Sequence, residues 1–401
     1  MLRFFLATIV AILVNPIGQG TSVAQTPVPE PGGLSADTDL AINNPDEYAW
    51  RLFLFMSRQA AAGTAGVADP AKTIQQYDPD TPVVWETWAL ASGTGATQIG
   101  SEVYQPKGVK PVDWSMLPRG PTPPAKLLSV NTKSGAPRAN LFSPQANVLL
   151  APLSPLDQEV RMNKGAFTFI RDNELYNSNG LEAKFAAAQA AKNPDLIQFP
   201  REAKEIKAQW EKMDMTKEQQ EKARYHWRTI GTDIYKLTAI HIITKDLPSW
   251  FWCDFIHVDY EQENGTKLPS RDSTTRPSPG QPNPPARGSV DGERREVSNT
   301  KWANYRLRGT QVSFVDARGS PVILGNPEIE TEFPDQSSCM ACHARATIGP
   351  LNASKKVSHL SGGEDANVQP PNPALFANNG SLLFLQNDFV WSAPFRAQPK
   401  E

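Results

Sequence analysis

The chain has 401 residues, with 40 basic and 42 acidic side chains, a formal net charge of −2 and only 3 cysteines. This near-neutral balance, without a basic stripe, argues against a nucleic-acid binder, and three cysteines are too few for a disulfide framework. The length suits one large domain or two ordinary ones, and 10 Trp and 17 Phe can fill a large core.

The first residues predict an export signal. Arg3 supplies a positive charge, residues 4–14 are almost wholly apolar, and small residues end at Ala24, where a signal peptidase would cut. The apolar run is about 11 residues long, whereas a spanning helix needs about 20, so a cleaved signal peptide over residues 1–24 is favoured over an uncleaved membrane anchor. We expect a mature chain of residues 25–401 that has no membrane span and resides in the periplasm.

The first half of the mature chain predicts helices separated by loops. A helix is expected after Asn44, because Asn caps it, Pro45 suits its first turn and two acids stand at its positive end. Residues 83–88 predict a short strand or a turn-rich segment, and the Gly-, Pro- and Ser-rich residues 92–144 predict extended loops. Two further helices are predicted, at residues 165–173 and 181–192.

The strongest β-strand signal lies in the second half. Residues 201–225 have high helix propensity, although residues 204–210 are equally compatible with a strand. Residues 237–244 alternate and are β-branched, residues 250–258 are rich in aromatic side chains, and a turn separates the two runs. This pattern predicts a β-hairpin.

A long polar stretch follows that hairpin. Residues 261–300 are rich in Pro, Ser, Arg and Gly, so they cannot bury enough apolar surface to order themselves. A domain boundary is the alternative, but residues 302–309 and 311–315 resume strand-like sequence. We therefore predict the α+β fold class: a single, loop-rich domain over residues 25–401, with antiparallel strands and a long polar loop at 261–300.

One motif near the end of this domain carries the chemistry. Residues 339–343 have the pattern C-x-x-C-H, in which two thiolates add to the vinyl groups of a haem and the next imidazole lies under the iron. With 3 Cys and 5 His in the chain, a chance match is expected roughly 3 times in 10,000. We predict one covalent haem c, with thioethers at Cys339 and Cys342 and His343 as the proximal iron ligand.

Two other readings of this motif remain open. A thioredoxin-like thiol pair would begin a helix after a strand in a βαβ unit, and residues 334–338 do not resemble that strand. A zinc site needs a fourth ligand, and His343 directly follows Cys342, which is a poor spacing for two tetrahedral ligands. The export signal favours haem, because such haems are attached outside the cytoplasm. The third cysteine, Cys253, is expected to be a buried thiol.

The second iron ligand is not determined by the sequence. In small class I cytochromes c a Met follows the motif, but here no Met follows His343, and the only later histidine is His359. The leading candidates are His241 and His257, which would share a face of the hairpin because both numbers are odd. Both could not reach the same iron, and for each one taken alone a core histidine is the favoured reading. Weaker candidates are His226, Met162, Met213 and Met215.

Haem propionates need cationic partners, and three side chains are candidates. Arg345 directly follows the motif, Lys245 follows the first hairpin strand and Arg306 lies in the later strand-like segment. The alternative for each is an ordinary solvated surface charge.

Several short segments besides the motif carry a resemblance. They are residues 241–245, 248–250, 255–259, 304–305, 309–311 and 337–344, with residues 85–88 and 388–392 further away. Together they resemble a family of exported bacterial monohaem cytochrome c proteins whose role is largely unassigned. The chain departs from the family's Thr-Phe-Glu-His pattern, having Asp-Phe-Ile-His at residues 254–257. The resemblance implies haem c and export, and it supplies no substrate.

These observations support three hypotheses about function. The first is a periplasmic monohaem c-type cytochrome that transfers single electrons to and from redox partner proteins, with a filled sixth iron position. The second is a peroxidase- or oxygenase-like haem enzyme with an open position lined by His257, Trp252 and Asp254, motivated by the size of the chain. The third is a haem sensor or a partner subunit of a larger oxidoreductase. Because no substrate pocket is recognisable, electron transfer is favoured.

Overall fold

The described part of the chain is built on one antiparallel β-sheet. The computed structural model describes residues 30–31, 35–92, 100–117, 158–230, 232–260, 262–263, 266–267, 272, 297–329, 336–360 and 368–401. The predicted export segment at 1–24 and most of the predicted polar loop at 261–300 lie outside these residues. Among the described helices, none has both the length and the apolar character that crossing a membrane requires.

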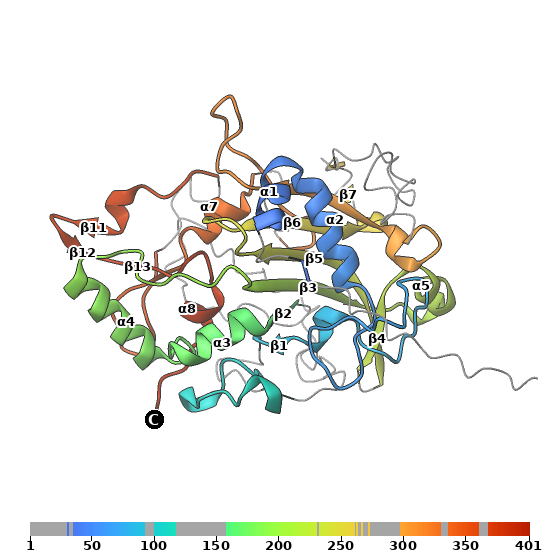
Figure 1. Ribbon diagram of the computed structural model, residues 1–401, viewed down its shortest axis with the longest axis horizontal. Helices are drawn as coiled ribbons and strands as arrows, with labels where there is room; N and C mark the ends of the chain where they lie inside the picture. The colour runs from blue at the N-terminus through green and yellow to red at the C-terminus, as the bar shows by residue number, and fades with distance from the viewer. Residues whose placement is uncertain are drawn as a thin grey trace, which may run out of the picture.

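Seven strands form the main sheet, and all its neighbouring pairs are antiparallel. Their order is β1-β2-β3-β5-β6-β9, and β4 pairs with the first residues of β5 (Figure 1). The strands are β1 (Ala89–Leu90), β2 (Gln158–Met162), β3 (Lys204–Lys212), β4 (Trp227–Ile230), β5 (Asp233–Thr244), β6 (Phe251–His257) and β9 (Tyr305–Gln311).

The predicted hairpin is confirmed as β5 and β6, joined by a turn at residues 245–249. The ambiguous segment at 204–210 belongs to strand β3. Because β2 and β5 flank this strand and bond its backbone on both sides, tertiary pairing overrides its helix propensity.

Helices surround the sheet, and three of them confirm predictions: α2 follows Asn44, while α3 and α4 match the predicted helices at 165–173 and 181–192. Residues 83–88 are turn-rich, with the 3-10 helix η1 (Val84–Thr87) leading into β1. The described helices are α1 (Ser35–Asn43), α2 (Pro45–Met56), α3 (Lys164–Asp172), α4 (Ser178–Ala191), α5 (Glu218–Arg224), α7 (Cys339–His343) and α8 (Ser392–Arg396).

Short elements complete the described chain. The remaining 3-10 helices are η2 (Pro106–Gly108), η3 (Trp114–Met116), η5 (Met215–Lys217), η6 (Val258–Tyr260), η7 (Lys301–Asn304) and η8 (Pro373–Leu375). Three two-stranded pairs are formed by β7 (Gln262–Glu263) with β8 (Thr266–Lys267), β10 (Thr347–Ile348) with β13 (Leu385–Gln386), and β11 (Ala377–Asn378) with β12 (Ser381–Leu382). The architecture is therefore α+β in one domain, as predicted.

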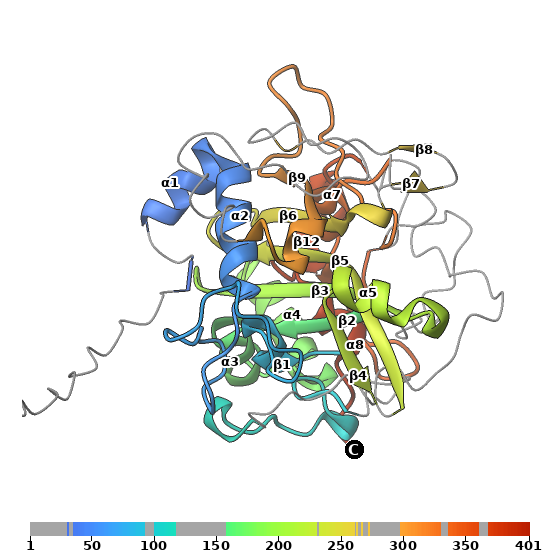
Figure 2. The ribbon, with the colours of Figure 1, turned by 90° about the vertical axis from the view of Figure 1, so that its right-hand side faces the viewer.

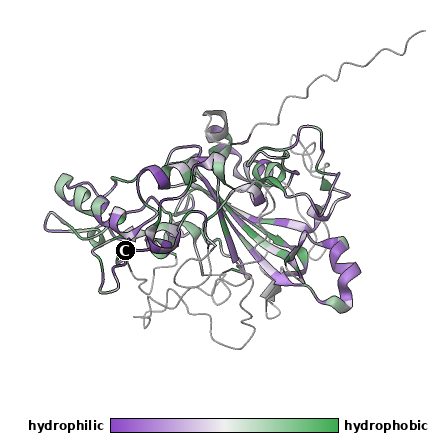
Figure 3. Cartoon of the chain, turned by 90° about the horizontal axis from the view of Figure 1, so that it is seen from below, coloured by the Kyte–Doolittle hydropathy of each residue, from purple (hydrophilic) through white to green (hydrophobic). Residues whose placement is uncertain are grey.

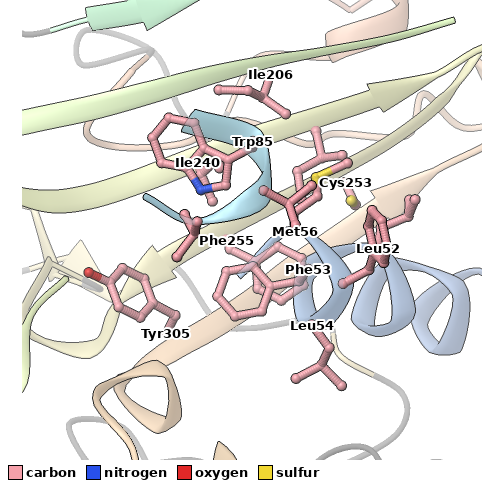
Figure 4. Packing of buried hydrophobic residues seen from close by; sticks show 14 of the residues in the cluster. Leu52, Phe53, Leu54, Met56, Trp85, Ile206, Ile240, Cys253, Phe255 and Tyr305 are labelled. Atoms are coloured by element: carbon pink, nitrogen blue, oxygen red, sulfur yellow. The ribbon is translucent and has the colours of Figure 1, made fainter. Parts of the chain in front are cut away.

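One face of the main sheet, which we call the apolar face, is covered by α2 (Figure 2). Phe53 of α2 stacks on Phe255 of β6 with ring centroids 4.2 Å apart, and Trp50 meets the same ring edge-on at 5.0 Å. Figure 4 shows side chains of α2, η1 and the strands β3, β5, β6 and β9 filling this cluster. Cys253 lies within it and is 2% exposed, so the predicted buried thiol is confirmed.

The opposite face, which we call the polar face, combines aromatic and polar side chains. Successive side chains of a strand point to opposite faces, and the strands in Figure 3 accordingly carry both hydrophilic and hydrophobic colours. Glu205 and Gln209 of β3, His241 of β5, and Trp252 and Asp254 of β6 share the polar face. All of them except His241 are buried, so this face places charges beneath the surface of the protein.

Candidate functional site

Helix α7 holds the C-x-x-C-H motif and is anchored to the end of strand β9. The Ser338 hydroxyl caps the helix by accepting the Ala341 N–H at 3.3 Å. Gln311, the last residue of β9, donates from Nε2 to that hydroxyl at 2.8 Å and accepts the Met340 N–H at 3.1 Å. Because Gln311 pairs with Trp252 across the sheet, the motif lies beside the polar face.

The two motif cysteines are not joined by a disulfide. Cys339 is 9% exposed, and its Sγ lies 3.2 Å from the carbonyl oxygen of Leu324. Cys342 is half-buried, and its own carbonyl accepts the indole N–H of Trp391 at 3.2 Å. Both thiols therefore belong to a short helix whose backbone is tied to β9 on one side and to the C-terminal segment on the other.

His343 has a defined tautomer. Its Nδ1 lies 2.8 Å from the carbonyl oxygen of Phe389, and since a carbonyl can only accept, Nδ1 carries the proton. In a neutral imidazole this makes Nε2 the basic nitrogen, which is the arrangement of a metal-ligating histidine oriented by a backbone carbonyl. The Trp252 ring packs against the imidazole with centroids 4.6 Å apart.

The Phe389 carbonyl belongs to a turn with an uncommon backbone conformation. Asp388 and Phe389 both have left-handed backbone conformations, with φ of +46° and +68°. Such a conformation costs a non-glycine residue roughly 1–2 kcal/mol, so other contacts must stabilise two in succession. One of these contacts is an ion pair in which Lys245 Nζ lies 2.5 Å from Asp388 Oδ1.

The predicted propionate partners have different surroundings. Lys245 is 6% exposed and bonds to Asp388 and to the Pro248 carbonyl. Burial lowers the pKa of Lys245 and raises that of Asp388, so each charge depends on the other. Arg345 is buried and donates to the carbonyls of Ala341 and Gln369, at 2.6 and 3.0 Å. Both side chains are therefore engaged by carbonyl or carboxylate groups of the protein.

Arg306, the third predicted propionate partner, is 2% exposed and pairs with Ile256 in register. Arg306 therefore lies on the polar face together with Asp254, which precedes Ile256 by two residues in β6. A guanidinium at this depth is not a solvated surface charge, so the alternative reading of Arg306 is wrong. Its role toward a haem stays a prediction.

The polar face beside Trp252 contains a histidine–carboxylate pair. His241 Nδ1 lies 3.1 Å from Asp254 Oδ1, which also accepts from Asn326 Nδ2 at 2.8 Å. Asp254 is fully buried, and its Oδ2 has no hydrogen-bond partner in the described part of the chain, with Arg308 Nε 3.9 Å away. Because Trp252 and Asp254 are successive side chains on this face, the pair lies about 7 Å along the strand from the residue that packs on His343.

His257 lies on the apolar face, so the expectation that it shares a face with His241 is wrong. His241 is opposite Asp254 in the register, and His257, three residues further along β6, therefore points to the other face. His257 is fully buried and stacks on Tyr225 at 3.7 Å. Its Nε2 faces the Arg224 carbonyl at 3.4 Å and its Nδ1 accepts the Asp259 N–H at 3.2 Å.

His257 is consequently a core histidine, and burial lowers its pKa to about 3.

His226 is also a core histidine. It is fully buried, with Nε2 2.8 Å from Glu86, Nδ1 3.1 Å from the Tyr77 hydroxyl, and its ring stacked on Trp302. Burial lowers the pKa of His226 to about 4, and the Arg228 charge adds to this. Both ring nitrogens of each histidine are engaged by protein groups.

His359 lies closer to the motif than its polar sequence context suggests. Its ring packs edge-on against Trp391 at 5.4 Å and against Phe395 at 4.9 Å, and Trp391 is the residue that donates to the Cys342 carbonyl. Burial lowers the pKa of His359, which favours the neutral imidazole. The structure therefore adds His359 to His241 as a candidate for the second iron ligand.

The methionine candidates divide by burial. Met162 and Met213 are buried in the protein, while Met215 is 53% exposed. Met162 belongs to the same hydrophobic cluster as Cys339 and Met340 of helix α7, and all three methionines stay the weaker candidates named above.

The alternative readings of the motif find little support. Strand β9 before α7 belongs to the main sheet and β10 after it pairs with β13, so the described strands around the motif do not form the βαβ unit of a thioredoxin-like protein. Within the described residues, no cluster of three or more His, Cys, Asp or Glu side chains is arranged to hold a metal ion. A haem iron differs, because its porphyrin supplies four ligands and the protein only one or two.

The residues present suit a haem c. Two thiols separated by two intervening residues, followed by an imidazole whose Nδ1 proton is held by a carbonyl, are the donor set for two thioethers and one axial nitrogen. The Asp254 Oδ2 atom, which has no hydrogen-bond partner among the described residues, and the His241–Asp254 contact show that this side of the sheet is built for polar contacts.

Comparisons with known proteins found no match: no family model, no curated protein and no solved structure is significantly similar to the chain. The chemistry of the site is therefore inferred from its own residues.

Proposed function

We propose that this protein is an exported monohaem c-type cytochrome that transfers single electrons. One observation carries the proposal: His343 of the C-x-x-C-H motif donates its Nδ1 proton to the Phe389 carbonyl. This bond selects the tautomer whose Nε2 can bind iron, and neither a disulfide exchange pair nor a buried structural thiol pair would need it. The family resemblance stated above supports the same reading.

The residues have separate tasks in this proposal. Cys339 and Cys342 hold the haem through thioethers, and His343 supplies the axial nitrogen. When bound, the haem contributes an iron that accepts one electron from a donor protein and passes it to an acceptor protein. Trp252 packs against the imidazole and limits its rotation. The hydrogen bonds of α7 to Gln311 and Trp391 would keep the motif in place.

The proposal includes export to the periplasm, because a haem of this type is attached outside the cytoplasm. It rests on the positive and apolar pattern of residues 1–24. The partners are redox proteins that dock near the motif.

The test is covalent haem in the full chain and its loss in variants. We expect the purified, exported protein to give a haem-staining band on a denaturing gel, the Cys339→Ala and Cys342→Ala variants to stain more weakly, and the double variant not to stain. Cys253→Ala is the matched control, because that buried thiol lies on the apolar face and should not affect staining. Covalent haem in the double variant would contradict the proposal.

A second candidate function, a haem enzyme with an open sixth position, is favoured by the contact of His241 with the buried Asp254 on the polar face. Optical and EPR spectra of the loaded protein, with carbon monoxide added to the ferrous form, separate the two functions. A low-spin spectrum that carbon monoxide does not change supports electron transfer. A high-spin spectrum with ready binding supports an enzyme or a gas sensor.

A further inference from the structure

A buried ion pair holds the turn that faces His343. Lys245 follows strand β5, and its Nζ lies 2.5 Å from Oδ1 of Asp388, with the two side chains 6% and 3% exposed. The other carboxylate oxygen accepts the Phe199 N–H at 2.7 Å. The Asp388 carboxylate is therefore bound through both oxygens to two separate parts of the fold.

The conformation of this turn depends on such contacts. Asp388 and Phe389 are both left-handed, and two non-glycine residues in succession adopt this conformation only when their surroundings impose it. Asn387, just before them, is fully buried and donates its N–H to the Ala346 carbonyl at 2.8 Å. With Asn387 and Asp388 both fixed, the Phe389 carbonyl points at Nδ1 of His343, 2.8 Å away.

We propose that the Lys245–Asp388 ion pair is a positioning device that keeps the Phe389 carbonyl on His343 and thereby lowers the reduction potential of an iron bound to that histidine. This inference rests on the proposed function, because it concerns the same histidine. Lys245 and Asp388 bond to each other, to the Pro248 carbonyl and to the Phe199 N–H, so we treat both as positioning residues that act through Phe389.

The direction of the effect follows from the hydrogen bond. A carbonyl that accepts the Nδ1 proton increases the electron density on Nε2 and makes the imidazole a stronger donor. A stronger donor stabilises ferric iron more than ferrous iron, so the bond lowers the potential. When the turn relaxes and the bond weakens, the potential should rise.

The experiment uses the full chain with its haem attached and compares midpoint potentials. In the double variant Lys245→Met/Asp388→Asn both charges are removed together, so no unpaired buried charge remains and the net charge of the chain is unchanged. We expect the ratio of reduced to oxidised protein at a fixed potential to increase by about tenfold, which is ~59 mV for one electron.

The matched control is an ion pair at the other end of strand β5. Lys236 Nζ lies 2.6 Å from Glu221 Oε1, and the two side chains are 6% and 13% exposed. The double variant Lys236→Met/Glu221→Gln should lose stability without shifting the potential. A general loosening of the fold would affect both double variants alike.

The single variant Lys245→Met is a second test, for use if the Lys245→Met/Asp388→Asn double variant does not fold. In Lys245→Met alone, loss of a positive charge near the iron would lower the potential through space, whereas a weakened hydrogen bond raises it. A rise therefore supports the positioning role, and a fall or no change overturns it. If the parent chain carries no covalent haem, the proposed function itself is wrong; if it carries haem whose potential none of these changes affects, only the positioning role is wrong.

Discussion

The two faces of the main sheet are buried to a similar extent and differ in chemistry. On the apolar face, Phe53, Trp50 and Phe255 form a close aromatic cluster, with centroids 4.2 to 5.7 Å apart. On the polar face, Glu205 and Asp254 place carboxylates beneath the surface. Both faces belong to the same strands, so the alternation of side chains, and not the backbone, separates them.

This difference separates stability from function. Apolar burial stabilises a fold in proportion to the area removed from water, so the apolar face accounts for the sheet and α2. Burying a carboxylate is costly unless it is paired or has a task. On the apolar face the buried Glu159 is paired with Arg161, whereas on the polar face Oδ2 of Asp254 has no hydrogen-bond partner among the described residues. The C-x-x-C-H helix lies beside the polar face, and the two histidines with both ring nitrogens occupied are not on it.

The largest effect should come from the apolar face. Phe255→Ala removes a ring that stacks on Phe53 and meets Trp50, and such truncations lower the free energy of unfolding by about 3–5 kcal/mol. Urea denaturation monitored by circular dichroism measures this loss. Leu383→Ala, at a residue that is 41% exposed, is the control and should change stability by less than about 0.5 kcal/mol. Equal effects of the two substitutions would contradict the described core.

A pH-dependent effect should come from the polar face. Burial raises the pKa of Glu205 from 4.5 to about 7, although the Ser392 hydroxyl and Arg396 oppose the shift. A carboxyl whose folded pKa exceeds its unfolded pKa contributes stability that is present below pH 4.5 and is lost as the pH rises to 7. Glu205→Gln removes this loss, so the variant should gain on the parent by up to about 3 kcal/mol between pH 4 and pH 8.

Urea midpoints of both proteins at pH 4, 5.5 and 8 measure this difference. Glu182→Gln, at an exposed position in helix α4, is the control and should follow the parent at every pH. Parallel curves for the parent and Glu205→Gln would show that the Glu205 carboxyl ionises inside the fold as it does in water.

The smallest effect distinguishes the two histidines of the hairpin. His257→Gln breaks two hydrogen bonds in the core and should lower the free energy of unfolding by about 1–3 kcal/mol without changing the haem spectrum. His241→Gln lies on the polar face, so it should alter the optical spectrum or the response to carbon monoxide. A spectral change in His257→Gln with none in His241→Gln would reverse this assignment.

Local patterns predicted much of the fold. The cap at Asn44, the alternation in residues 237–244 and the aromatic run that follows were sufficient for α2 and the β5–β6 hairpin. They could not determine the register. Pairing His241 with Cys253 or with Asp254 differs by one residue, and that single step decides whether His257 lies on the polar or the apolar face.

The site was predictable only where it is contiguous in the chain. The motif itself needs residues 339–343 alone, whereas its surroundings come from Gln311, Trp252 and Phe389. The left-handed pair at residues 388–389 has no glycine to signal it. The positive charge of Lys245 predicts a haem-propionate partner. Its partner in the structure, Asp388, is 143 residues away, and a local sequence pattern cannot predict such a pairing.

That separation also has a consequence for the order of folding. The hydrogen bond from His343 spans 46 residues and the ion pair behind it spans 143, whereas α7 closes within five residues. Contacts between distant residues form late, because the loop that joins them must first be closed. The thiols can thus meet a haem while the motif is still accessible, and the turn at residues 388–389 would close on the histidine afterwards.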